Sequence, residues 1–173
     1  MIAEVARLLK QNKIKLPFGL YITNSVQEEV GLRGAQMIVE TIQPNVAIVT
    51  DVTHDTNTPM LNKIKQGDIK CGEGPVIYYG PAVQNNLLDL IISTAEKNKI
   101  PFQRGAASRA TGTDTDAFAF ANGGVASALV SLPLRYMHTT VESVSIKDVE
   151  SVIFLIYNIL QKIKNNQDFR YLK

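Results

Sequence analysis

Short segments with two different periodicities alternate along the chain, and this alternation is what most constrains its fold. Residues 46–52 and 125–132 are short, mostly apolar runs, which are typical of strands buried on both faces of a sheet. Residues 2–12, 33–42 and 84–98 instead repeat apolar side chains at the spacing of one helix face. Strands that alternate with helices predict an α/β sandwich of three layers around a mostly parallel sheet.

Weaker patterns predict the remaining elements. Phe18–Ser25 is rich in β-branched and aromatic residues, which favours a strand. Residues 145–163 form the last predicted helix, in which Ser145 and Asp148 resemble a capping box. The other predicted elements are strands at 76–79 and 101–106, helical turns at 116–121, and loops at 53–74 and 105–115.

Composition excludes several classes of protein. Of 173 residues, 45% are hydrophobic and 20% charged, which is a globular balance and excludes wholesale disorder. The net charge of +2 does not indicate a nucleic-acid partner. The single cysteine, Cys71, excludes an internal disulfide framework, and the apolar run 149–160 carries Glu150 and is too short to span a bilayer. Because the first residues are also too charged for a signal peptide, we expect a cytoplasmic protein without a membrane partner.

Chemically capable side chains follow the predicted strands. In an open α/β sheet, sites form beyond the carboxyl ends of the strands. Glu28 and Glu29 follow residues 18–25, Asp51 follows residues 46–50, and Arg135, Tyr136 and His138 follow residues 125–132. We therefore expect carboxylates and an imidazole to gather at one edge of the sheet.

Oxygen and imidazole ligands of this kind suit zinc, manganese or cobalt. A hydrolytic site also needs a carboxylate that leaves the metal free and takes a proton from water, and two adjacent glutamates can divide these roles. Taken singly, each residue has an ordinary alternative: Glu28 and Glu29 as an exposed pair, Asp51 as a loop cap, and His138 as a core or surface histidine. The combination points to a metal hydrolase.

The loop Gly112-Thr113-Asp114 is a further candidate site. Backbone donors beside a flexible glycine can bind an oxyanion or one end of a substrate. An ordinary turn with an aspartate cap explains the same residues equally well.

Four blocks in this order resemble a known family. Val26–Ala35 resembles the block TVQEEVGLRGA of metallopeptidase family 42, and Asp51-Val52-Thr53 resembles its next block. Gly112-Thr113-Asp114 resembles GGTDA, and Leu132–Glu142 resembles VPCRYIHSPVE. The family comprises metallo-aminopeptidases, including glutamyl and tetrahedral aminopeptidases, and some members have been called cellulase M. The similarity extends over about residues 1–163.

The resemblance implies a zinc-peptidase-like, or phosphorylase/hydrolase-like, fold and a homo-oligomeric enzyme that removes N-terminal residues from peptides with two divalent metal ions. It implies that Glu28 is the general base, that Glu29 and His138 bind one metal ion, and that Asp51 binds the other. The residues it places near the substrate are Gly112, Thr113, Asp114, Arg135 and Tyr136.

Three elements of the family pattern would precede the first helix: a His-x-Asp element, a small β-domain used in dimerisation, and a bridging aspartate. None is found in this sequence, so residues 1–173 are expected to be the carboxyl-terminal portion of a catalytic domain. On this view the chain alone binds metal weakly and hydrolyses little or nothing. Asp116 is a second acid that the family pattern lacks.

Two other functions are compatible with the sequence. A truncated relative could be a non-catalytic interaction module that pairs through an uncovered sheet edge. A polysaccharide hydrolase would need two carboxylates flanking a sugar bond, a scheme in which His138 has no role.

Overall fold

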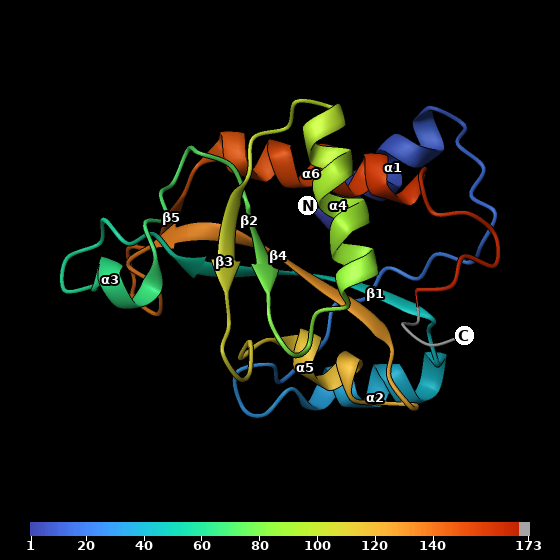
Figure 1. Ribbon diagram of the computed structural model, residues 1–173, viewed down its shortest axis with the longest axis horizontal. Coiled ribbons are helices and arrows are strands. Elements are labelled where there is room, and N and C mark those ends of the chain that lie inside the picture. Colours follow the sequence, from blue (N-terminus) through green and yellow to red (C-terminus); the bar gives the residue numbers. More distant parts are fainter. Residues whose placement is uncertain (170–173) are drawn as a thin grey trace.

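A five-stranded mixed sheet runs through the computed structural model, which describes residues 1–169 (Figure 1). The helices α1 (Ile2–Gln11), α4 (Asn85–Lys97) and α6 (Ile146–Leu160) cover one face of the sheet. The helices α2 (Arg33–Ile42) and α5 (Asp114–Ala119) lie against the other face. The predicted three-layer α/β class is therefore confirmed, and the last four residues of the predicted portion 1–173 lie outside the described residues.

The strands pair in the order β1-β4-β2-β3, with β5 on β4. Their bounds are Val46–His54 (β1), Val76–Tyr79 (β2), Gln103–Ala106 (β3), Ala126–Arg135 (β4) and Ser143–Val144 (β5). The pairs β1–β4 and β2–β3 are parallel, whereas β2 and β5 run antiparallel to β4. The carboxyl ends of β1 and β4 therefore lie at the same end of the sheet, whereas the carboxyl ends of β2 and β3 lie at the opposite end.

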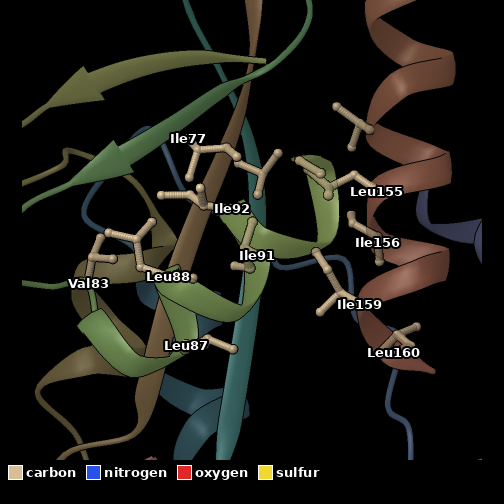
Figure 2. Close-up of a cluster of buried hydrophobic side chains, with 14 of the residues drawn as sticks. Ile77, Val83, Leu87, Leu88, Ile91, Ile92, Leu155, Ile156, Ile159 and Leu160 are labelled. Carbon is tan, nitrogen blue, oxygen red and sulfur yellow. The ribbon is translucent and has the colours of Figure 1, made fainter. Parts of the chain in front are cut away.

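The larger core lies between the sheet and the helices α4 and α6 (Figure 2). Leu87, Leu88 and Ile91 of α4 meet Leu155 and Ile159 of α6, and all five side chains are fully buried. Their spacing along each helix is that of one apolar face, so burial of these faces holds both helices on the sheet.

Alternation along β1 determines which face carries the polar side chains. Ala47 and Val49 pack with α2 and α5, whereas Ile48 and Val52 pack with the core under α4 and α6. Successive side chains of a strand point to opposite faces. Asp51 and Thr53 therefore lie on the α2/α5 face.

The predicted strand Phe18–Ser25 is not formed. Residues 15–25 form no regular secondary structure and bend at residues 17 and 18; no backbone hydrogen bond joins them to other described residues, and Tyr21 and Ile22 are exposed. A segment with strand propensity becomes a strand only when another strand lies beside it, and here none does. In contrast, β1 and β4 extend beyond the predicted ends at Val52 and Leu132, while α3 (Lys63–Gln66) and β5 were not predicted.

The predicted capping box at the start of α6 is also wrong. Ser145 occupies the N-cap position, but its side chain makes no capping hydrogen bond. Asp148 is completely buried, and its carboxylate accepts hydrogen bonds from the backbone N–H of Gly72 (2.7 Å) and of Gly74 (2.8 Å). The acid therefore fastens a distant loop to α6 instead of capping its own helix. None of the helices within residues 1–169 combines the length and apolarity needed to cross a bilayer.

Candidate functional site

Glu28 and Glu29 lie in a turn that leads into α2. The carbonyl oxygen of Glu28 accepts hydrogen bonds from the N–H groups of Gly31 and Leu32 at 3.2 and 3.0 Å. The N–H of Gly34 donates to the carbonyl of Val26 at 2.9 Å, and a Cβ at Gly34 would lie only 2.4 Å from that oxygen. Glycine at this position therefore lets the first turn of α2 lie against the chain before it, which positions both glutamates at the start of the helix.

His138 meets Glu29 across the molecule. Its Nε2 lies 3.1 Å from Oε1 of Glu29, although the two residues are 109 positions apart in the sequence. His138 follows the end of β4 in a left-handed backbone conformation, with φ of 61°. The two side chains are 69% and 72% exposed, so they meet at the surface.

Asp51 lies within β1, not beyond its end as the strand-end argument predicted. One carboxylate oxygen accepts a hydrogen bond from the N–H of Val52 at 2.7 Å. Burial raises the pKa of Asp51, and the nearby charges of Asp114 and Glu29 raise it further. Asp51 therefore belongs to the same electrostatic environment as the α2 turn.

The pKa of Glu28 is also raised, first by burial and then by the negative charges of Asp51, Glu29 and Asp114. His138 acts in the opposite direction on this pKa. The structure thus brings Glu28, Glu29, Asp51 and His138 together, as the strand-end argument expected, and adds Asp114 to the group.

Asp114 is the first residue of α5, and its negative charge contributes to raising the pKa of both Glu28 and Asp51. One carboxylate oxygen accepts a hydrogen bond from the hydroxyl of Ser25, while the other, Oδ1, is buried without a hydrogen-bond partner. Thr113 caps α5 by accepting a hydrogen bond from the N–H of Thr115. The N–H of Gly112 donates to Asp116 at 2.9 Å, so this loop has the form of a turn closed by an aspartate.

Arg135 and Tyr136 contact each other at the carboxyl end of β4. The Arg135 guanidinium lies 5.2 Å from the centre of the Tyr136 ring and donates to its hydroxyl. Arg135 also lines an open hollow of about 570 Å³ beside the start of α6, together with Cys71 and Gly72. Burial alone would raise the pKa of Asp55, but backbone hydrogen bonds from Asn57 and Cys71 lower it, and the positive charge of Arg135 adds to this lowering.

Three residues of the same sheet face were not singled out from the sequence. The hydroxyls of Thr53 and Tyr78 are 2.6 Å apart, and Ser131 is the register partner of Asp51 on β4. Two-residue alternation from Asp51 could have identified Thr53. Tyr78 and Ser131 depend on strand pairing, for which the sequence carried no signal.

The donor set fits part of a divalent-metal site. Carboxylate oxygens and an imidazole suit zinc and similar ions. Oδ1 of Asp114 has no hydrogen-bond partner among the described residues, and a bound cation would offset the repulsion between the neighbouring carboxylates. Within residues 1–169, however, no three His, Cys, Asp or Glu side chains are arranged to hold a metal ion. Glu29, His138 and Asp51 therefore do not form a complete metal site among these residues.

Comparison with known proteins identifies the family. The model of the M42 glutamyl aminopeptidase family matches residues 1–155. The chain belongs to the M42 family. This confirms the resemblance carried by the four sequence blocks, and it makes the chain a relative of hydrolases that act as aminopeptidases.

Individual M42 relatives agree with this assignment. The chain is 37% identical to the lysyl aminopeptidase of Pyrococcus furiosus over 161 residues, which cover 93% of this chain and 44% of that protein. The TET aminopeptidase from a Thaumarchaeota archaeon superimposes with a TM-score of 0.87 at 30% identity, covering 94% of this chain and 46% of that one. The TET1 peptidase of Pyrococcus horikoshii, which can assemble into a tetrahedron or an octahedral shell, gives a TM-score of 0.61 at 29% identity, covering 79% and 39%. The chain thus spans about half the length of the relatives it matches.

Proposed function

We propose that this chain supplies the general base and part of the dinuclear metal centre of an M42 aminopeptidase. The observation that carries the proposal is the position of Glu28, which lies beside the Glu29–His138 pair and within the electrostatic influence of Asp51. Four side chains from three separated parts of the sequence would then supply the roles that a metal-assisted hydrolase needs.

Glu28 would act as the base. Burial and the neighbouring carboxylates raise its pKa, which strengthens its tendency to accept a proton. It would take a proton from the attacking water and deliver it to the leaving amine of the peptide. Glu29 is more exposed and engaged with His138, which suits it better to hold a metal ion than to move a proton.

Glu29 and His138 would hold one ion and Asp51 the other, with zinc, cobalt or manganese as the candidates. When bound, such ions polarise the scissile carbonyl and acidify water. Gly112, Thr113, Asp114, Arg135 and Tyr136 would lie near the peptide substrate.

We further propose that residues 1–173 alone bind metal weakly and hydrolyse peptides slowly or not at all. The exposure of Glu29 and His138 and the lack of a three-residue ligand group within residues 1–169 support this. We also propose a cytoplasmic, homo-oligomeric protein, in line with the single cysteine and with the assemblies of the TET1 peptidase.

The test is a chimaera in which this chain replaces the matching 161-residue stretch of the Pyrococcus furiosus lysyl aminopeptidase. With cobalt or zinc added, the chimaera should release N-terminal residues from aminoacyl-nitroanilides, whereas this chain alone should release very little. Glu28→Gln should lower kcat about 10²–10⁴-fold because it removes the base.

The matched control is Glu40→Gln, an exposed glutamate near the far end of α2, which should leave kcat unchanged. Undiminished activity of the Glu28→Gln chimaera would refute the assigned role of this residue.

A non-catalytic interaction module is the second candidate. Segment 15–25, which has no backbone hydrogen bond to other described residues and exposes apolar side chains, favours it because such a segment can pair with a partner's strand. A folded chimaera without aminopeptidase activity would support this alternative.

A further inference from the structure

The strand β1 forms one edge of the sheet along its whole length. It pairs with β4 on one side, and among the described residues no strand pairs with its other side. β1 has nine residues, and its sequence VAIVTDVTH contains no lysine, arginine, proline or glycine. A long edge strand that lacks such residues is ready to pair with a further strand, because nothing in it opposes another ladder of hydrogen bonds.

Hydrogen bonds at the two ends of β1 show which of its backbone groups point away from β4. The N–H of Asp55 donates to the carbonyl of Leu134 at 2.9 Å, and the N–H of Ala126 donates to the carbonyl of Asn45 at 3.3 Å. The register between these points is continuous, and the backbone groups of successive strand residues point to opposite sides. Odd-numbered residues therefore face β4. The residues whose N–H and C=O groups face outward are Val46, Ile48, Thr50, Val52 and His54.

Most of these outward backbone groups have no partner among the described residues. The exception is the N–H of Val52, which donates to the carboxylate of Asp51 at 2.7 Å. The N–H groups of Ile48 and Thr50, in the middle of the strand, are thus available to a strand that lies alongside.

The side chains of β1 are also incompletely covered, whereas those of its neighbour are fully covered. Residues 127–134 of β4 are all buried, but in β1 only Ala47 is buried. Val49 on the α2/α5 face and Ile48 and Val52 on the opposite face remain half-buried. A strand beside β1 would extend both faces and cover these apolar side chains. The strand that fits here is therefore mostly apolar on both of its own faces.

The opposite edge of the sheet, β3, is protected. It has four residues, among them Arg104 and Gly105, and the Arg104 guanidinium lies 3.6 Å from the carboxylate of Glu96. Short length, a charged side chain and a glycine all discourage further pairing. Of the two edges, β1 is thus the one open to another strand.

The lengths of the relatives indicate which strand would occupy this edge. The lysyl aminopeptidase of Pyrococcus furiosus and the Thaumarchaeota TET aminopeptidase each match nearly all of this chain with less than half of their own length. The rest of each relative has to pack against the matched portion. An unprotected edge beside half-covered apolar side chains is suited to that contact.

We infer that the outer edge of β1 binds one strand of the portion of an M42 aminopeptidase that this chain does not span, when that portion is supplied as a separate polypeptide. This docking depends on the family and on the sheet edge, and not on the proposed catalysis, so it requires neither metal nor substrate. Formation of the complex and activity of the chimaera are separate measurements, and either proposal can fail alone.

The experiment is co-expression of this chain with a tagged second polypeptide, the part of the Pyrococcus furiosus lysyl aminopeptidase outside its matching 161-residue stretch. The two chains should purify together in EDTA. Thr50→Pro should lower the recovery of this chain about tenfold or more, because proline removes an outward N–H and its ring obstructs a neighbouring strand. The hydrogen bonds between β1 and β4 are not affected, since the N–H of Thr50 does not face β4.

Ala106→Pro is the matched control on the protected edge. The N–H groups of Gln103 and Ala107 donate to the carbonyls of Pro75 and Tyr79 at 2.8 Å each, so the N–H of Ala106 faces away from β2. This substitution should leave the recovery unchanged.

Amide hydrogen exchange of the unsubstituted chain provides a readout that does not depend on the folding of any variant. In the free chain the amides of Ile48 and Thr50 should exchange faster than those of Ala47 and Val49, which face β4. In the complex the exchange of Ile48 and Thr50 should slow by about tenfold or more, because both amides enter a new ladder.

Three results would overturn the docking site. The first is that the two polypeptides do not purify together. The second is a complex in which Ile48 and Thr50 still exchange as in the free chain, or one that forms equally well with folded Thr50→Pro. The third is protection of these two amides that rises with the concentration of the free chain, which would mean that a second copy occupies the edge.

Discussion

Buried and half-buried carboxylates in this protein differ in what compensates their charge. Asp148 and Asp55 each accept two backbone N–H groups, which satisfies them where they lie. Asp51 accepts one backbone N–H, and Asp114 accepts the hydroxyl of Ser25 on one oxygen while its Oδ1 has no partner among the described residues. Since an uncompensated buried carboxylate is costly, the satisfied pair has a structural role, and the other two are candidates for function.

Replacement of Asp148 should therefore be strongly destabilising. Asp148→Ala leaves the buried N–H groups of Gly72 and Gly74 without their acceptor, and we expect the free energy of unfolding to fall by about 2–4 kcal/mol. Urea denaturation measures this directly. The exposed Glu150, on the same helix, provides the control: Glu150→Ala should change stability by less than about 0.5 kcal/mol. Equal effects of the two substitutions would contradict the structural role of Asp148.

The thiol of Cys71 should be unreactive in the folded chain. Burial, a hydrogen bond with Asp55 and the charge of that carboxylate raise its pKa to about 12. Because the thiolate is the reactive form, iodoacetamide should label Cys71 on the order of 10³-fold more slowly in the native protein than in denaturant near neutral pH. Mass spectrometry of quenched samples follows the labelling. Equal rates in both states would show that these surroundings do not raise the pKa of the Cys71 thiol.

At the scale of elements, the approach of α2 to the preceding chain positions Glu28 and Glu29. The approach is possible because Gly34, buried in the first turn of α2, has no side chain to meet the backbone of Val26. The arrangement belongs to the turn and the helix together, since neither could position the glutamates without the other.

A methyl group at Gly34 should disturb this junction. Gly34→Ala would place a carbon within 2.4 Å of a backbone oxygen, and we expect a loss of about 1–3 kcal/mol in the free energy of unfolding. Met37→Ala, at an exposed position of the same helix, should have little effect. Chemical denaturation of both variants tests this. A Gly34→Ala variant as stable as Met37→Ala would show that the backbone near Val26 shifts to accommodate the methyl group at little cost in free energy.

At the scale of the whole molecule, an apolar surface lies next to backbone groups that have no protein partner among the described residues. Residues 15–25 form no regular secondary structure and make no backbone hydrogen bond with other described residues. Tyr21, Val26 and Val30, in and beside this segment, are 68%, 68% and 58% exposed. Exposed apolar side chains beside unpaired N–H and C=O groups favour association.

We therefore expect the isolated chain to self-associate, with an average mass that rises with concentration in multi-angle light scattering. Ile22→Lys should reduce the association because it adds a charge to the extended segment. Phe154→Lys changes an exposed apolar residue on α6, away from this segment, and should leave the association unchanged. A monomer at all concentrations would contradict the prediction.

Local pattern was sufficient to predict much of the fold. The apolar spacing in residues 33–42 and 84–98 predicted α2 and α4 within one residue at each end, because a helix is stabilised by neighbours in the sequence. The alternation of helices and strands predicted the α/β class for the same reason. The failures, at Phe18–Ser25 and at the Ser145–Asp148 pair, occurred where the partner of a backbone or side-chain group is distant in the sequence.

Residue identity and local pattern were enough to find the side chains capable of chemistry: two adjacent glutamates, an aspartate within one apolar run and a histidine after a second apolar run. The fold was needed to learn that Glu29 lies 3.1 Å from His138 and that Asp114 influences the pKa of Asp51. This difference arises because side-chain identity and local periodicity are properties of a segment. Pairing and electrostatic proximity depend instead on which segments the sheet and its two helical layers bring together.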